Sequence, residues 1–82
     1  MTTELDANTQ ALRLHNASLS VRRERDARIT SMQWRVERNQ RETRLGLPLT
    51  DSTPVLDQYI TDLCNVPAQE GFPFTVNWPE IP

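Results

Sequence analysis

The stretch TPVLDQYITDLCN, residues 53–65, contains the clearest helical pattern of this 82-residue sequence. Its large apolar residues recur at intervals of three and four, which places them on one face of a helix. They are Leu56, Tyr59, Ile60 and Leu63. Thr53 before Pro54 is typical of a helix start, with a hydroxyl N-cap and proline at the first helical position. We therefore predict a helix over residues 54–65, ended by Pro67, whose apolar face the rest of the chain has to cover.

A second helix is predicted over residues 20–44, because this stretch contains no Gly or Pro and is rich in Arg and Glu, which favour helices. Ser20 is a suitable N-cap, and Gly46 is typical of a helix C-terminus. Apolar residues at steps of three and four again form one face. The two faces predict a mainly α fold, a two-helix hairpin. Its predicted core comprises Ile29, Met32, Val36, Leu56, Tyr59, Ile60 and Leu63.

The last residues, VPAQEGFPFTVNWPEIP (66–82), contain four Pro and Gly71, so we predict an extended, proline-rich tail. Gly71 is expected to make the turn that returns this tail over the helices. From residue 72, every second residue is large and apolar, and a period of two places these side chains on one face. They are Phe72, Phe74, Val76 and Trp78. Pro73 and Pro79 lack the N–H donor that a sheet requires, so the stripe is not expected to join a sheet.

This apolar stripe has two interpretations. In one, it packs on the hairpin and completes a core that is thin in so short a chain, because burying an aromatic side chain is worth about 2–3 kcal/mol. In the other, the tail binds another protein, as extended segments with alternating anchors do in grooves and at sheet edges. The two interpretations coexist if some residues face inward and others outward. Trp78, the stripe residue nearest the chain end, is then the first choice for an outward contact.

A polar arm over residues 1–19 precedes the hairpin. Leucine recurs every seventh residue, at Leu5, Leu12 and Leu19. A two-stranded coiled coil needs a second apolar seam, but the positions four residues further on are Thr9, Asn16 and Arg23. The arm is therefore a helix that docks on a partner helix, an extension of the first helix, or a mobile segment. The predicted organisation is an arm (1–19), a helical hairpin (20–66) and an extended tail (67–82).

Charge is distributed unevenly along the chain. All nine basic residues are Arg and lie between Arg13 and Arg44, so residues 1–44 carry a net charge of +3 and residues 45–82 a net charge of −5. One interpretation is a solvated helix with interleaved charges, in which Glu24 pairs with Arg28, Glu37 with Arg41, and Arg38 with Glu42. The other is that Arg side chains bind carboxylates of a partner or of the acidic half. Nucleic acid is not an expected partner, because acids interrupt the Arg run and the pI is about 5.2.

Catalytic and membrane functions are not expected. The sequence has one Cys and one His, no metal-ligand spacing and no glycine-rich phosphate loop, so we predict a non-enzymatic protein without metal or cofactor. No apolar run approaches the roughly 20 residues of a membrane span. The N-terminal sequence MTTELDANTQ is polar and acidic, unlike a secretory signal, so we expect the protein in the cytoplasm of the cell that makes it.

The C-terminal part of the chain resembles the C-terminal signature of the phage tail assembly chaperone family, which has a Tyr-initiated helix, a Pro, a polar pair, Gly-Phe-Pro and a final Trp-Pro. The matching residues are Tyr59, Leu63, Pro67, Gln69, Gly71, Phe72, Pro73, Val76, Trp78, Pro79 and Pro82. Upstream, the Arg/Glu-rich helix with its Trp34–Arg35 pair and the linker LGLPLTD also resemble the family, so the likeness covers about residues 21–82. Where family members carry an Arg-rich segment after the Tyr, this chain has ITDLCN (60–65).

The resemblance implies a non-enzymatic phage protein that binds a tail-fibre or other tail protein in the host cytoplasm during virion assembly. A thin core and an apolar tail also favour retention in the mature virion, and oligomers are expected only through the partner. The predicted partner-binding residues are Trp34, Arg35, Phe72, Phe74, Val76 and Trp78. Two alternatives stay open: a purely structural virion subunit, such as a fibre or baseplate accessory protein, and a small regulatory protein of the infected cell.

Overall fold

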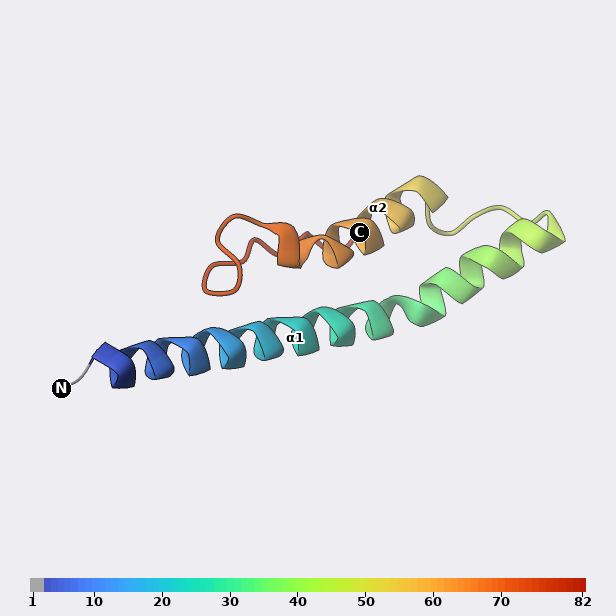
Figure 1. Ribbon diagram of the computed structural model, residues 1–82. Helices are drawn as coiled ribbons and strands as arrows, with labels where there is room; N and C mark the ends of the chain where they lie inside the picture. Colours follow the sequence, from blue (N-terminus) through green and yellow to red (C-terminus); the bar gives the residue numbers. More distant parts are fainter. Residues whose placement is uncertain (1–2) are drawn as a thin grey trace.

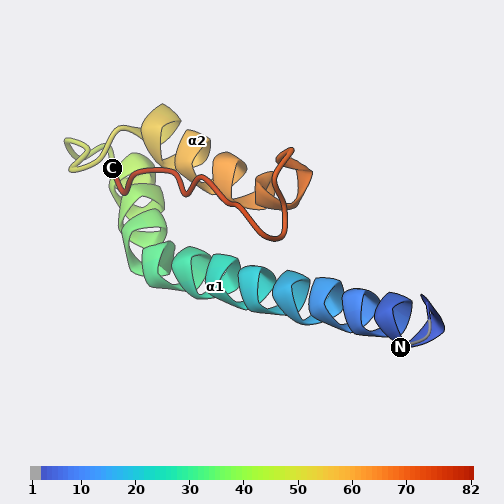
Figure 2. The same ribbon diagram turned by 90° about the vertical axis from the view of Figure 1, so that its left-hand side faces the viewer.

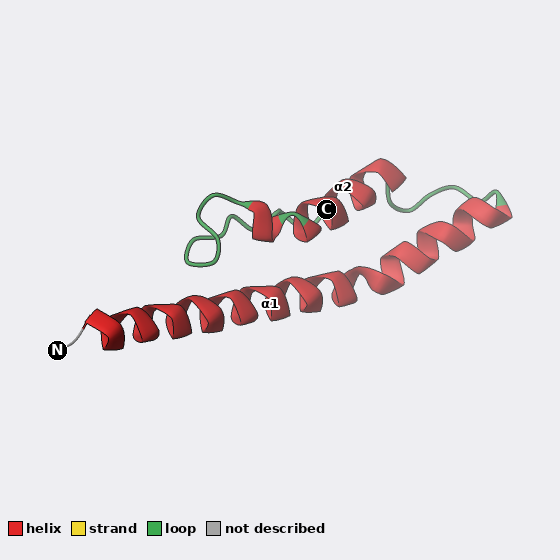
Figure 3. Cartoon of the chain, viewed as in Figure 1, coloured by secondary structure: helices red, strands yellow, loops and turns green. Residues whose placement is uncertain are grey.

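Two α-helices and one short 3₁₀ helix make up the regular structure: α1 (Thr3–Leu45), α2 (Thr53–Cys64) and η1 (Val66–Ala68) (Figure 1). The structure is a computed structural model that describes residues 3–82, with side chains from residue 7 onward. Helices and loops account for this whole range, and no strand occurs in it (Figure 3). The prediction of a mainly α fold with two helices in a hairpin-like arrangement is confirmed.

α1 continues without interruption through the predicted boundary between the arm (1–19) and the hairpin (20–66). No Gly or Pro occurs between residues 3 and 45, so no residue type in this range breaks the helix. Ser20 lies in the helix interior, and the prediction that it caps the helix is wrong. The part of the arm that the structure describes is therefore an extension of the first helix. At a rise of about 1.5 Å per residue, this 43-residue helix accounts for the longest dimension of the molecule, 66 Å.

α1 ends at Gly46 in a Schellman motif. Gly46 has a φ of 69°, a left-handed conformation that glycine adopts without a steric penalty. Its N–H donates to the Thr43 carbonyl at 3.2 Å, and the Leu47 N–H donates to the Glu42 carbonyl at 2.9 Å. These two bonds satisfy carbonyls that have no partner within the helix. The predicted helix end at Gly46 is therefore confirmed.

α2 begins one residue earlier than predicted. Ser52 is the N-cap residue, and its side chain makes no capping hydrogen bond. Thr53 is the first helical residue, so the prediction that its hydroxyl caps the helix is wrong. The physical reason is a tertiary contact, because Thr53 Oγ1 and the Asn39 side-chain amide of α1 are hydrogen-bonded at 3.0 and 3.2 Å.

The core lies between α2 and α1, on the concave side of α1, which is bent toward α2 and the tail (Figure 2). Four of the residues predicted for the core are buried: Met32, Leu56, Tyr59 and Leu63. Ile29 and Ile60 pack against them, and Val36 is half-buried. Val66 is also fully buried, although it was not predicted for the core. The 3₁₀ turn of η1 continues past the end of α2, so the chain does not turn away from the hairpin at Pro67.

The tail returns from a tight turn at Gly71. The N–H groups of Phe74 and Thr75 donate to the Gly71 carbonyl at 3.1 and 2.9 Å. A Cβ at position 71 would lie 2.8 Å from the Thr75 carbonyl oxygen, so this turn requires glycine. The Phe72–Pro73 peptide bond in the turn is cis. The tail then runs back along α2 toward the first turn of that helix, where Pro82 lines a common surface hollow with residues of α2 (Figure 2).

Leu63→Ala is expected to lower the free energy of unfolding by about 2–5 kcal/mol, because it empties space in a core with few members. Val55→Ala, on the exposed side of α2, is the control and should change it by about 0.5 kcal/mol or less. Urea unfolding followed by far-UV circular dichroism measures both values. Equal destabilisation by the two substitutions would contradict this placement of the core.

Candidate functional site

One carboxylate, that of Asp51, holds the α1–α2 linker on α1. Arg35 binds it through two donors: Nη2 lies 2.8 Å from Oδ1, and Nε lies 3.2 Å from Oδ2. Arg38 Nη2 donates to Oδ2 at 2.8 Å. The side chains of Arg35 and Asp51 are each only 16% exposed. A two-donor arginine–carboxylate pair fixes orientation as well as distance, so Asp51 determines where the linker lies on α1.

Two more polar residues of α1 bind the same linker. Asn39, a buried residue, donates from Nδ2 to the Asp51 carbonyl at 3.2 Å. Glu42 accepts hydrogen bonds from the Thr50 N–H at 3.0 Å and from the Thr50 hydroxyl at 2.7 Å. The four α1 positions are spaced i, i+3, i+4 and i+7, so they lie on one face of the helix. We call the following set the polar clamp: Arg35, Arg38, Asn39 and Glu42 of α1 with Thr50, Asp51 and Thr53.

The polar clamp lowers the pKa of both its carboxyl groups. Hydrogen bonds from Arg35 and Arg38 lower the pKa of Asp51 from its ordinary 3.8 to about 2. Hydrogen bonds from the Thr50 backbone and hydroxyl lower the pKa of Glu42. In return, the hydrogen-bonded Asp51 carboxylate raises the pKa of the Arg35 guanidinium. These three shifts all favour the charged forms of Asp51, Glu42 and Arg35.

The arginines of α1 are divided between the two interpretations of this helix. Arg35 and Arg38 bind a carboxylate from the acidic half of the same chain. Glu24 and Arg28 form the predicted pair along the helix, at 3.2 Å. Two predicted pairs are wrong. Glu37 and Arg41 form no ion pair, and Arg38 and Glu42 each bind the linker instead. Arg35, predicted to bind a partner protein, uses its donors within the chain.

The side-chain amide of Gln69 closes the turn of the tail on itself, and a stacked guanidinium attaches the tail to the hairpin. Gln69 Nε2 donates to the Asn77 carbonyl, and Gln69 Oε1 accepts from the Asn77 N–H, both at 2.8 Å. The Arg28 guanidinium lies over the Trp78 ring, 4.3 Å from its centroid, which is a cation–π contact. Trp78 also packs against the core. The expectation that Trp78 points outward is therefore wrong for this structure, because the core and Arg28 cover the ring.

Phe74 is the stripe residue that points outward. Its exposed fraction is 68%, whereas Phe72, Val76 and Trp78 are all half-buried. It lines a shallow surface hollow with Leu14, an exposed leucine from the N-terminal part of α1. The stripe is thus divided, with three residues turned toward the hairpin and one toward solvent. Phe74 and Leu14 form an apolar surface that we call the Phe74 patch.

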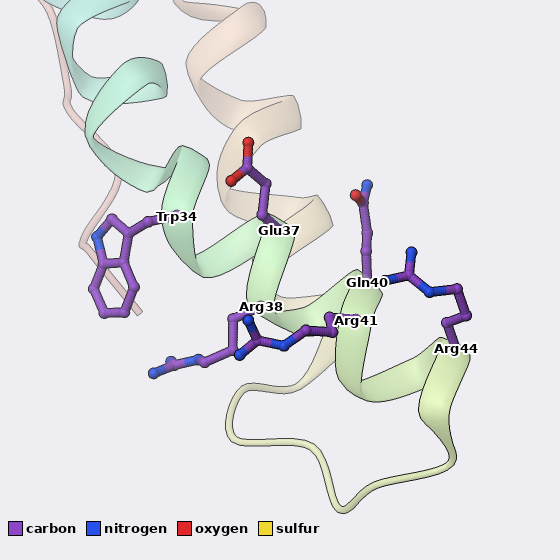
Figure 4. Close-up of a pocket in the computed structure, with 6 residues that line it drawn as sticks. All are labelled: Trp34, Glu37, Arg38, Gln40, Arg41 and Arg44. Carbon is purple, nitrogen blue, oxygen red and sulfur yellow. The ribbon is translucent and has the colours of Figure 1, made fainter.

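Trp34, which the helical pattern leaves off the apolar face, lies on the surface with an exposed fraction of 59%. The Arg38 guanidinium lies 4.8 Å from the centroid of its ring. Trp34 lines one side of a surface hollow, which we call the Trp34 hollow (Figure 4). Its lining residues are Trp34, Glu37, Arg38, Gln40, Arg41 and Arg44.

The sequence did not predict two features of the linker and its surroundings. Asp51 is the centre of the polar clamp, and the one signal for it is the excess of acids in the half that follows an Arg-rich helix. The linker leucines Leu45, Leu47 and Leu49 are all exposed. Their alternation is visible in the sequence, but a loop offers no helical or strand periodicity from which to infer the direction of a side chain.

Groups that could carry other chemistry are scattered over the described residues. His15 and Cys64 are exposed and lie on different helices. Among the side chains that the structure describes, from residue 7 onward, no group of three His, Cys, Asp or Glu residues is arranged to hold a metal ion. Neither helix in this range is apolar enough over sufficient length to cross a membrane.

Comparison with known proteins gives one match. A family model described as phage tail assembly chaperone protein matches residues 18–82. This range contains the packed part of α1, the polar clamp, α2 and the tail, and it confirms the likeness inferred over residues 21–82. No curated protein and no solved structure matches the chain.

Asp51→Asn is expected to lower the free energy of unfolding at neutral pH, because it removes the charge that binds Arg35 and Arg38. The pKa of Asp51 is about 2 in the folded chain and 3.8 ordinarily, so its stabilisation is complete above about pH 4 and is lost as the pH falls toward 2. The unfolding free energies of the native chain and the variant should therefore differ at neutral pH and converge between about pH 4 and about pH 2.

Urea unfolding at a series of pH values measures this convergence. Asp57→Asn is the matched control, because it removes an exposed carboxylate of α2 that lies outside the polar clamp. It should leave most of the stability at neutral pH in place. A constant gap between the native chain and Asp51→Asn across the acid range would contradict the assigned role of Asp51.

Proposed function

The chain belongs to the phage tail assembly chaperone family, and we propose that it binds a tail-fibre protein or another tail protein during virion assembly, without acting as an enzyme. Membership gives the chain a role in the assembly of a phage tail. The finer parts of the proposal are the kind of partner, the surface that binds it and its fate after assembly. The proposal also locates this binding in the host cytoplasm, where the tail is assembled.

The exposed Phe74 is the observation that carries the proposal. Burying a phenylalanine side chain is favourable by about 2–3 kcal/mol of free energy. Phe74 nevertheless stays exposed, although its neighbours in the stripe are turned toward the hairpin. The turn that carries it is held by hydrogen bonds to the Gly71 carbonyl and by the Gln69–Asn77 pair. A well-positioned aromatic side chain of this kind is a typical anchor for a partner protein.

Leu14 of α1 adds a second apolar side chain beside Phe74. It lies one turn before residue 18, where the family match begins, and it reaches the Phe74 patch because α1 continues beyond the packed hairpin. The patch therefore combines a side chain from the family-matched tail with one from the helical extension. A partner that covers both buries apolar surface that the free chain leaves in water, and this supports a stable complex.

Retention in the mature virion follows from the same argument. The core of this chain is small, and a bound partner adds stability to any protein that it binds only in the folded state. We therefore propose that the chain stays on its partner after assembly. A structural virion subunit would also be present in particles, so retention separates this proposal from a transient helper and from a regulatory protein of the infected cell.

Phe74→Ala is expected to weaken binding of the chain to a tail protein of the same phage by about 2 kcal/mol, because it removes the anchor of the patch. Ile81→Ala is the matched control, since Ile81 is an equally exposed apolar residue of the same tail, and it should change affinity by about 0.5 kcal/mol or less. Co-expressed tail proteins are captured through a tag on this chain, and affinity is then measured by titration calorimetry. Full binding by Phe74→Ala, with far-UV circular dichroism unchanged, would refute the role of the patch.

Mass spectrometry of purified particles tests retention. We expect the chain in mature particles, in a fixed ratio to the tail protein that it binds. Its presence in lysate together with unassembled tail protein, combined with absence from particles, would show instead that it leaves after assembly. Absence from both fractions would favour the regulatory alternative.

A further inference from the structure

The Trp34 hollow is lined by three arginines and one exposed aromatic ring, which follow one another along α1 (Figure 4). Arg38, Arg41 and Arg44 follow one another at intervals of three along α1, and all three line the hollow with Trp34. Glu37 is the single carboxylate in its lining. The hollow therefore has a surplus of positive charge, although the whole chain has a net charge of −2.

These arginines differ in what they bind. Arg38 is fixed, since it donates to Asp51 at 2.8 Å and its guanidinium stacks 4.8 Å from the Trp34 ring centroid. Arg41 and Arg44 make no hydrogen bond or ion pair with any described residue, and the one electrostatic effect of either on a carboxylate is that the charge of Arg41 helps to lower the pKa of Glu42. Like charges three residues apart on a helix repel each other in the free chain, and a bound carboxylate would relieve this repulsion. The two unpaired guanidiniums are thus free to bind an anion, beside an arginine that the polar clamp already holds in place.

We propose that the Trp34 hollow binds an acidic segment of the tail protein, with its carboxylates on Arg41 and Arg44 and an apolar side chain on Trp34. The inference rests on the proposed function and adds the chemistry of the partner at a second surface. Arginine suits this role because its planar fork binds carboxylates through two donors and stacks on aromatic rings. An exposed Trp beside Arg is also the composition typical of residues that dominate binding energy at protein interfaces.

Charge complementarity favours a protein over a nucleic acid. The hollow offers only Arg41 and Arg44 without an ion pair, which suits a short acidic segment better than a continuous row of phosphates. A second copy of this chain is the competing occupant, because residues 45–82 carry five acids and no base. Asp51 is used in the polar clamp, and the remaining acids are dispersed over α2 and the tail: Asp57, Asp62, Glu70 and Glu80. Such dispersed acids match a compact cluster of arginines less well than one contiguous acidic segment.

A synthetic peptide with alternating glutamate and alanine around one central phenylalanine is the first probe. Titration calorimetry with the unmodified chain measures its affinity, and we expect binding that weakens as the salt concentration rises from about 50 to about 500 mM. A peptide with glutamine in place of glutamate should not bind.

Fluorescence reports on Trp34 directly. Trp78→Phe leaves Trp34 as the only tryptophan, and circular dichroism checks that this variant keeps its fold. The acidic peptide should then change the fluorescence of Trp34 itself.

Single substitutions locate the site. Arg41→Ala and Arg44→Ala should each weaken peptide binding about threefold, and the double variant about tenfold. Arg23→Ala is the matched control, because it removes one exposed arginine of the same helix outside the hollow and should leave affinity unchanged. Equal loss with Arg23→Ala, or equal binding of the glutamine peptide, would overturn the proposal.

The tail protein provides the second probe and keeps the two proposals distinguishable. The Arg41→Ala, Arg44→Ala double variant should weaken its capture about tenfold. Unchanged capture by this variant, with loss of capture by Phe74→Ala, would overturn the acidic docking site and leave the proposed function standing. Failure of every variant and of the native chain to bind any tail protein would overturn both. Concentration-dependent self-association that the double variant abolishes would identify a second copy as the occupant and overturn the inference.

Discussion

The arrangement of this molecule depends on one carboxylate between two guanidinium groups. Exposed ion pairs contribute little to stability, but Asp51 and Arg35 are mostly buried side chains joined by two hydrogen bonds, and Arg38 adds a third. Asp51 lies two residues before the start of α2, so fixing it on α1 also fixes where α2 begins. The apolar face of α2 then lies on the middle of α1, where four buried side chains form the core.

A core this small leaves much of the chain's apolar surface in water. The tail covers part of it, because Gln69 holds the Asn77 backbone and Arg28 stacks on Trp78. The same tail leaves Phe74 exposed beside α1. One segment therefore completes the fold and supplies the surface that is proposed to bind a tail protein. In a family of assembly chaperones, this division is consistent with a chain that is stable alone and more stable on its partner.

The arginines of α1 are divided in a similar way. Arg35 and Arg38 bind the linker, and Arg28 covers Trp78, so these side chains stabilise the fold. Arg41 and Arg44, in the last turns of the same helix, have no such partner among the described residues. They line the same hollow as Trp34, and this shared lining is the reason to propose a binding surface there.

Local sequence determined the two helices, the end of α1 at Gly46 and most of the core, because helical periodicity and glycine conformation act over a few residues. It also carried the family likeness. Tertiary structure decided what depends on distant groups. Thr53 is hydrogen-bonded to Asn39 and does not cap α2, and Ser20 lies inside a continuous helix. Arg35 binds Asp51, and Trp78 is covered by the core and by Arg28. A polar or aromatic side chain takes the strongest partner within reach, and which partners are within reach is set only when the chain has folded.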